Sequence, residues 1–126
     1  MTPHFTVALD PKLACSCGCG MLPEQDFMDK VEALRVAYGK PLKVTSAARC
    51  PAYNAKVSST GEKGPHTTGR AIDFDIARGE AYKLAWLAFV HGFTGIGFQQ
   101  KGAGRFLHTD DLPDAPGQPR PTIWSY

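Results

Sequence analysis

The chain has 126 residues, 43% of them hydrophobic and 21% charged, with a formal net charge of +2 at pH 7. This is the size and composition of one globular domain, residues 1–126, with a single core. Its lysines and arginines are scattered, which argues against a nucleic-acid partner, and no apolar run approaches the ~20 residues that cross a bilayer, so no membrane insertion is expected.

Regular elements are expected along most of the chain after an irregular lead-in over residues 1–22. Residues 24–38 predict a helix because apolar side chains recur at helical spacing, and Gly39 marks its end. Residues 79–91 predict a second helix, in which Trp86 is expected to belong to the core. The other expected elements are strands over 42–46, 71–76, 94–99, 105–110 and 122–126, a short helix over 51–58 and a loop over 59–68.

Alternation within residues 71–76 indicates which side chains share a face of the sheet. Ile72 and Phe74 fall on one face, and Asp73 and Asp75 fall on the other. Together the elements predict an α+β fold, in which a small, mostly antiparallel sheet is flanked by two main helices and its short strands are joined largely by hairpins.

Two segments combine a histidine with a carboxylate. The first runs from His66 through Gly69 to Asp73, and the second is His108-Thr-Asp110. Together they offer a metal two imidazoles and one carboxylate, with one carboxylate to spare. Catalytic zinc uses three protein ligands of this kind and keeps a fourth position open. Gly69 allows a sharp turn between the loop that carries His66 and the strand that carries Asp73.

The spare carboxylate, Asp110, is the candidate general base. Strand periodicity places it on the same face as His108. A carboxylate beside the metal can accept a proton from water and pass it to the leaving amine. Asp75 and Asp111 are the fallback carboxylates, and Asp75 could instead orient a ligand histidine.

Six stretches, in order along nearly the whole chain, resemble a known family. They are Cys17-Gly-Cys-Gly20, Gly39 to Pro51 with Asn54, His66…Gly69…Ala71…Asp73, Gly95-Ile-Gly97, Phe106-Leu-His-Thr-Asp110 and Trp124-Ser-Tyr126. In this combination they resemble the zinc D-alanyl-D-alanine carboxypeptidase family, and within it the compact phage-type peptidases that include endolysins. The resemblance implies a D-Ala-D-Ala carboxypeptidase/hedgehog-like fold.

The resemblance also implies a function and its residues. It implies a zinc (Zn2+) metallopeptidase that hydrolyses peptidoglycan stem or cross-link peptides, as a carboxypeptidase or an endopeptidase. It implies that His66, Asp73 and His108 bind the zinc ion and that Arg49 lies near the substrate. A guanidinium can hold a peptide carboxylate or carbonyl in a forked contact and can stabilise an oxyanion, so Arg49 is both a catalytic and a substrate-binding candidate.

Ser46 and Trp124 are weaker substrate-binding candidates. Ser46 belongs to the same stretch as Arg49, and Trp124 could wall the cleft near the metal or serve only in packing. A surface salt bridge is the alternative role for Arg49.

Two positions depart from the family pattern. Relatives often carry serine two residues before the first ligand histidine, where this chain has Gly64. Other branches place an acidic residue three before the last ligand histidine, where this chain has Arg105. The second departure keeps a different class of protein open, a noncatalytic zinc-binding module that recognises the cell wall.

The state of the four cysteines, Cys15, Cys17, Cys19 and Cys50, is left open. A spacing of one residue is tighter than the two to four residues usual between zinc-ribbon ligands. Reduced thiols with one disulfide, a structural zinc site and a redox role are the alternatives. The last is the weakest, because the chain has no Cys-x-x-Cys.

The segment from Met1 to Thr6 lacks the basic start and apolar stretch of a signal peptide. We therefore expect a protein that is made in the cytoplasm and acts on the cell wall if released, for example during phage lysis. A monomer is also expected, although nothing in the sequence gives the oligomeric state.

Overall fold

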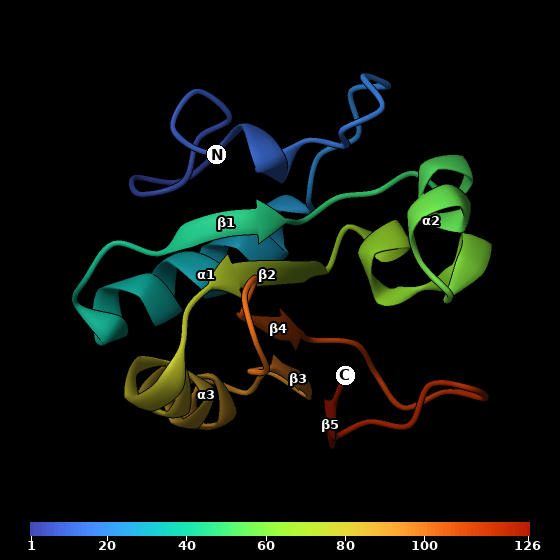
Figure 1. The fold of residues 1–126 in the computed structure, drawn as a ribbon. Coiled ribbons are helices and arrows are strands. Elements are labelled where there is room, and N and C mark those ends of the chain that lie inside the picture. The colour runs from blue at the N-terminus through green and yellow to red at the C-terminus, as the bar shows by residue number, and fades with distance from the viewer.

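The computed structural model describes residues 1–126 and arranges three α-helices around a five-stranded mixed sheet (Figure 1). The helices are α1 (Gln25–Tyr38), α2 (Pro51–Val57) and α3 (Arg78–Val90). The strands are β1 (Lys43–Ser46), β2 (Ala71–Asp75), β3 (Gly95–Gln99), β4 (Phe106–Asp110) and β5 (Thr122–Ser125). The predicted α+β fold is confirmed.

The strands lie in the order β1-β2-β4-β3-β5. All neighbours are antiparallel except β3 and β5, which are parallel. Only β3 and β4 follow one another as a hairpin, so the prediction of strands joined largely by hairpins is wrong. The reason is that longer segments separate the other strands: α2 lies between β1 and β2, α3 crosses from β2 to β3, and residues 111–121 carry the chain from β4 to β5 beside β3.

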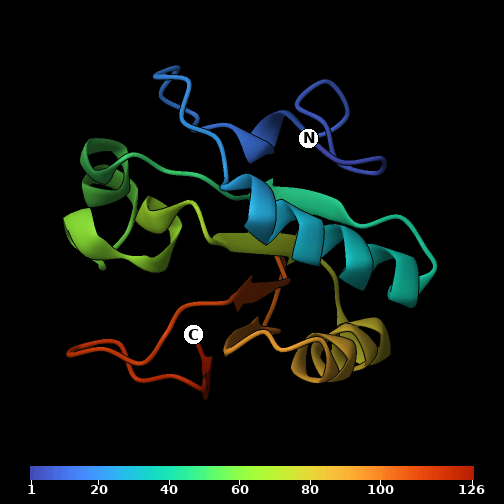
Figure 2. The ribbon, with the colours of Figure 1, turned by 180° about the vertical axis from the view of Figure 1, so that it is seen from behind.

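Helices α1 and α3 pack on the same face of the sheet and bury one apolar core against it. Figure 2 shows α1 crossing in front of the strands on this side. Ile72 and Phe74 of β2 are fully buried in that core, as the alternation predicted. Alternation therefore directs Asp73 of the same strand to the opposite face of the sheet, where the polar residues gather.

The prediction that Trp86 belongs to the core is wrong, because its side chain is exposed. Helix α3 buries a stripe made of Leu84 and three alanines, Ala81, Ala85 and Ala88. Trp86 lies off this stripe and is 60% exposed. Small residues on the buried side let the helix approach the sheet closely, so its large side chains point outward.

No helix of the chain has the length and apolar character needed to span a membrane.

Three short 3-10 turns lie outside the sheet. The lead-in contains η1 (Pro11–Leu13), and the segment predicted as a loop contains η2 (Gly61–Lys63) and η3 (Pro65–Thr68). Figure 1 shows α2, η2 and η3 gathered beside one end of the sheet. Gly69, in the left-handed conformation with φ 74°, turns the chain from η3 into β2.

Candidate metal centre

Strand pairing aligns the predicted site residues in one row across the sheet. Asp73 of β2 lies opposite His108 of β4, which lies opposite Gly97 of β3. Gly97 in turn pairs with Trp124 of β5. His66 enters this row from outside the sheet, because η3 and the Gly69 turn return the chain to the start of β2.

The two histidines meet the Asp73 carboxylate, one at each oxygen. Nε2 of His66 lies 3.3 Å from Oδ2 of Asp73, and Nδ1 of His108 lies 3.0 Å from Oδ1. The donor atoms of the three residues all lie within 4.8 Å of one another. All three residues are buried. The structure thus brings together the three residues predicted to bind zinc.

In each imidazole, the ring nitrogen that does not face Asp73 makes a hydrogen bond that orients the ring. Nδ1 of His66 donates a hydrogen bond to the Ala47 carbonyl at 2.7 Å. Nε2 of His108 is 2.8 Å from Oδ2 of Asp110. The nitrogens that remain, Nε2 of His66 and Nδ1 of His108, are those directed at Asp73. Histidine ligands of zinc are usually held by such an outer hydrogen bond, so the donor set fits a zinc ion.

Asp110 is a buried, fully paired carboxylate. Its side chain has no exposed surface, and Arg120 holds it in a fork with Nε at 2.9 Å and Nη2 at 2.8 Å. Burial raises the pKa of Asp110, but hydrogen bonds from His108 and Arg120 outweigh burial and lower that pKa to about 2. Asp110 is therefore an ionised acceptor that fixes the His108 ring.

Charges inside the row compensate one another. Burial raises the pKa of Asp73, but hydrogen bonds from His108 and His66 outweigh it and lower the pKa below its ordinary value. Burial lowers the pKa of His108, but its bonds to Asp110 and Asp73 outweigh this and raise the pKa. The buried Asp73 and Asp110 carboxylates thus favour positive charge at His108 between them.

Two glycines of β3 make room for the site. A Cβ atom at Gly95 would lie 2.3 Å from Oδ1 of Asp110, and one at Gly97 would lie 2.6 Å from the indole of Trp124. Any side chain at either position would displace the carboxylate or the ring. This close approach explains why positions 95 and 97 of the Gly95-Ile-Gly97 stretch are glycine.

The buried residues His66, Asp73 and His108 lie at the floor of a cavity of about 290 Å³. Arg49, Trp124 and Tyr126 line its walls, with residues of the α2–η3 segment completing the rim. The ring of Trp124 packs 5.1 Å from that of His108, centroid to centroid. Asp73 is the only carboxylate among the lining residues.

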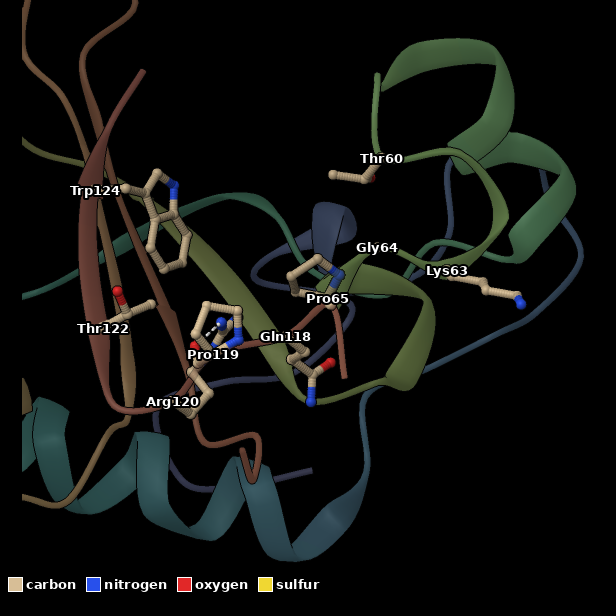
Figure 3. A pocket seen from close by; sticks show the side chains of 10 residues that line it. Thr60, Lys63, Gly64, Pro65, Gln118, Pro119, Arg120, Thr122 and Trp124 are labelled. Carbon is tan, nitrogen blue, oxygen red and sulfur yellow. Dashed lines mark hydrogen bonds between the residues drawn. The ribbon is translucent and has the colours of Figure 1, made fainter. Parts of the chain in front are cut away.

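A second cavity of about 500 Å³ shares Thr60, Pro65 and Trp124 with the first. Figure 3 shows Trp124 and Arg120 on one side of it and Thr60 and Lys63 on the other. The two cavities are neighbouring parts of one depression in the surface.

A sequence model of the family described as peptidase M15 matches residues 4–110, which include His66, Asp73 and His108. The chain belongs to the peptidase M15 family. Members of this family are zinc-dependent peptidases, so the family, the cofactor and the zinc metallopeptidase class inferred from the motifs are confirmed. No curated protein sequence matches the chain significantly.

In this M15 peptidase, Arg49 lies in the cavity and Ser46 does not. The Arg49 side chain donates from Nη1 to Oδ1 of the buried Asn54 at 3.1 Å, and its backbone N–H donates to the His66 carbonyl. Ser46 lines a smaller adjoining cavity of about 170 Å³, which shares Arg49 and Val57 with the 290 Å³ cavity. Trp124 lines the wall of the 290 Å³ cavity above the three proposed ligands, which is one of the two roles considered for it.

Both departures from the family pattern have a local structure. A Cβ atom at Gly64 would lie 2.1 Å from the Thr60 hydroxyl, so Thr60 fills the space that a serine there would need. Arg105 donates to the Gly102 carbonyl in the turn before β4 and is not among the residues that line the cavity.

The fallback carboxylates lie elsewhere. Asp75 is exposed at the end of β2. Asp111 is held by Arg70 and Lys30. Arg120 had no sequence signal beyond its charge, because its link to Asp110 depends on how the loop before β5 folds back.

Proposed function

We propose that this M15 peptidase hydrolyses peptidoglycan stem or cross-link peptides in an endolysin-like role. One observation carries the proposal: two imidazoles and a carboxylate converge within 4.8 Å at the floor of a cavity that also presents a guanidinium, that of Arg49. We include in the proposal that the protein is a monomer and that it reaches the cell wall after release, for example during phage lysis. Light scattering on the purified protein tests the first of these two points.

The proposed zinc ligands are His66, Asp73 and His108. Zinc held there would supply a Lewis acid, which lowers the pKa of water and polarises a peptide carbonyl. The protein's own contribution is orientation. The Ala47 carbonyl fixes the ring of His66, and the Asp110–Arg120 pair fixes the ring of His108.

Substrate contacts are proposed for Arg49, Trp124 and Tyr126. Asn54 holds one nitrogen of Arg49, which leaves the rest of the guanidinium for a peptide carboxylate or carbonyl. Tyr126 lines the same cavity as Arg49, so its hydroxyl can donate beside Arg49 at a developing oxyanion. Trp124 offers an apolar wall to the peptide. Because Ser46 lies outside this cavity, we assign it no direct contact.

Positive charge favours an anionic peptide along the whole depression. Lys63 lines the larger cavity, which holds no side-chain carboxylate, and Arg49 lines the smaller one. Stem peptides carry free carboxylates, and a depression that continues past the metal ligands can hold residues beyond the cleaved bond. This extension favours endopeptidase action on cross-links over release of a single terminal residue.

Asp110 is proposed here as a positioning residue instead of the general base. Both of its oxygens are occupied and its side chain is inaccessible to a substrate. A base with a pKa of about 2 is also poorly matched to proton transfer near neutral pH.

One observation favours the alternative function, a noncatalytic zinc-binding module that recognises the cell wall. No carboxylate other than Asp73 lines the cavity, so a second acidic group for proton transfer is not in contact with the space a substrate would fill.

Mass spectrometry of muropeptides after incubation with the zinc-loaded protein tests the proposal. Cleaved cross-links indicate an endopeptidase, and released D-alanine indicates a carboxypeptidase. His108→Ala is expected to abolish cleavage, whereas His91→Ala, at an exposed position after α3, is the matched control and should retain it. Full turnover by metal-free protein would refute the zinc mechanism. Zinc binding at the three ligands with intact muropeptides would favour the recognition module.

A further inference from the structure

Four thiols converge at a second place on the molecule, away from the zinc ligands described above. Cys15, Cys17 and Cys19 belong to the loop after η1, and Cys50 directly precedes α2. Their sulfur atoms all lie within 4.8 Å of one another. The cluster thus joins two segments that lie 35 residues apart, from Cys15 to Cys50.

The sulfur distances fit a shared metal ion better than disulfides. Sγ of Cys17 lies 3.4 Å from Sγ of Cys15 and 3.6 Å from Sγ of Cys50. A disulfide requires about 2.0 Å. Four sulfurs placed tetrahedrally at about 2.3 Å from zinc are about 3.8 Å apart. The observed contacts are close to the second value.

The loop is folded so that its three thiols face one point. Gly18 and Gly20 both have a φ of +87°, a conformation that other residues rarely adopt. The Gly18 N–H bonds to the Cys15 carbonyl, and the Cys15 N–H bonds to the Met21 carbonyl, which closes the loop on itself. These turns explain how cysteines spaced more tightly than in zinc ribbons can still converge.

Backbone donors support the sulfurs from the side of α2. The Cys50 N–H points to Sγ of Cys15 at 3.3 Å, and the Tyr53 N–H points to Sγ of Cys50 at 3.4 Å. Hydrogen bonds of this kind stabilise negative charge on sulfur, which is the form that binds metal.

We propose that Cys15, Cys17, Cys19 and Cys50 bind a second zinc ion with a structural role. Four protein thiolates fill a tetrahedral site and leave no open position, which distinguishes a structural from a catalytic zinc. The site joins a lead-in that has little regular structure to the segment that carries Arg49, next to Cys50. The Ala48 N–H to Leu13 carbonyl bond lies in the same junction.

Metal content tests the proposal independently of the peptidase function. Protein purified under reducing conditions is expected to contain two zinc ions per chain. The double variant Cys17→Ser/Cys19→Ser is expected to contain one, and so is His66→Ala/His108→Ala. Ser16→Ala, an exposed position in the same loop, is the control and should keep two. Two zinc ions in the cysteine variant would overturn the proposal.

Cobalt substitution locates each ion. The thiolate-to-cobalt charge-transfer absorption is expected to remain in His66→Ala/His108→Ala and to be lost in Cys17→Ser/Cys19→Ser. Its loss in the histidine variant, with retention in the cysteine variant, would contradict the assignment.

Thiol labelling of the unmodified protein covers the case in which the cysteine variant does not fold. In the zinc-loaded protein all four cysteines are expected to resist alkylation and to react after a chelator is added. Rapid alkylation of the exposed Cys17 and Cys19 in the zinc-loaded protein would overturn the proposal, as would an intact mass that shows disulfides.

Discussion

A carboxylate near a metal can act as a base or can hold a ligand in place, and its surroundings distinguish the two roles. Asp110 is buried between His108 and Arg120, with a pKa lowered to about 2. Strand alternation was sufficient to predict that His108 and Asp110 share a face. It could not predict Arg120, because that contact is made by a loop ten residues further along the chain.

Asp110→Asn is therefore expected to weaken zinc binding at the three ligands by about 10- to 100-fold, because the His108 ring loses its charged acceptor. Competition with a chelator, measured on the protein as purified, gives the affinity. Asp75→Asn changes an exposed carboxylate of β2 and is the control. Unchanged zinc affinity together with lost turnover would instead restore Asp110 as a base.

Acid unfolding of the metal-free protein tests the same residue. Because the folded-state pKa of Asp110 is about 2, below its ordinary value of 3.8, its ionised form stabilises the fold above pH ~4. This contribution, about 2 kcal/mol, is lost as the pH falls toward 2. Urea unfolding at several pH values should show the difference between the original protein and Asp110→Asn narrowing on acidification. A constant difference over this range would refute the assigned pKa.

At the scale of elements, the side chains of neighbouring strands determine which residues β3 can carry. The Gly-Ile-Gly stretch was visible in the sequence, but its reason lies in β4 and β5, which place Asp110 and Trp124 against the bare backbone. Trp86 shows the opposite case. Its helix was predicted, yet a stripe of alanines turned the indole outward.

Gly97→Ala is expected to destabilise the protein by about 1–3 kcal/mol, because the new methyl group overlaps the Trp124 ring. Zinc content should be retained while the fluorescence of Trp124 changes. Gly79→Ala is the matched control. It adds the same methyl group in the first turn of α3, where nothing lies within 4 Å, and should be neutral or stabilising by about 0.5–1 kcal/mol. Equal effects of the two substitutions would contradict the packing argument.

At the scale of the whole molecule, one arginine connects segments far apart in the sequence. Arg70, next to β2, forks onto Asp111 beyond β4 and also binds Asp26 of α1. Lys30 of α1 binds Asp111 as well. The Asp111 side chain is only 2% exposed and makes ion pairs with both Arg70 and Lys30.

Arg70→Met is expected to lower the free energy of unfolding by about 2–3 kcal/mol, since Asp111 stays buried with Lys30 as its remaining partner. Chemical denaturation measures this loss. Adding Asp111→Asn should recover part of it by removing the poorly paired charge. Lys56→Met, on an exposed position of α2, should change stability by less than about 0.5 kcal/mol. Strictly additive losses in the double variant would argue against the coupling.

The sequence of helices and strands along the chain was largely predictable, whereas the side-chain contacts between distant segments were not. Periodicity indicated the helix over 24–38 and the strand over 71–76, since it records which side chains face the core, and turn residues indicated where other elements begin and end. The zinc ligands were predicted because the two short segments that carry them resemble the family's motifs, whereas their spacing alone was a modest signal. The cysteine cluster was left open, because spacing alone does not show that Gly18 and Gly20 turn the loop toward Cys50.

Strand β5 lies at the edge of the sheet, so the wall of the cavity and the metal ligands belong to different strands. This four-residue strand pairs with β3 alone and contributes Trp124 to the wall but no metal ligand. Edge strands open locally at a lower free energy than central ones. Amide hydrogens of β5 should therefore exchange with solvent faster than those of the central strands β2 and β4. Breathing of this edge would move Trp124 and widen the entrance of the cavity while His66, Asp73 and His108 keep their arrangement.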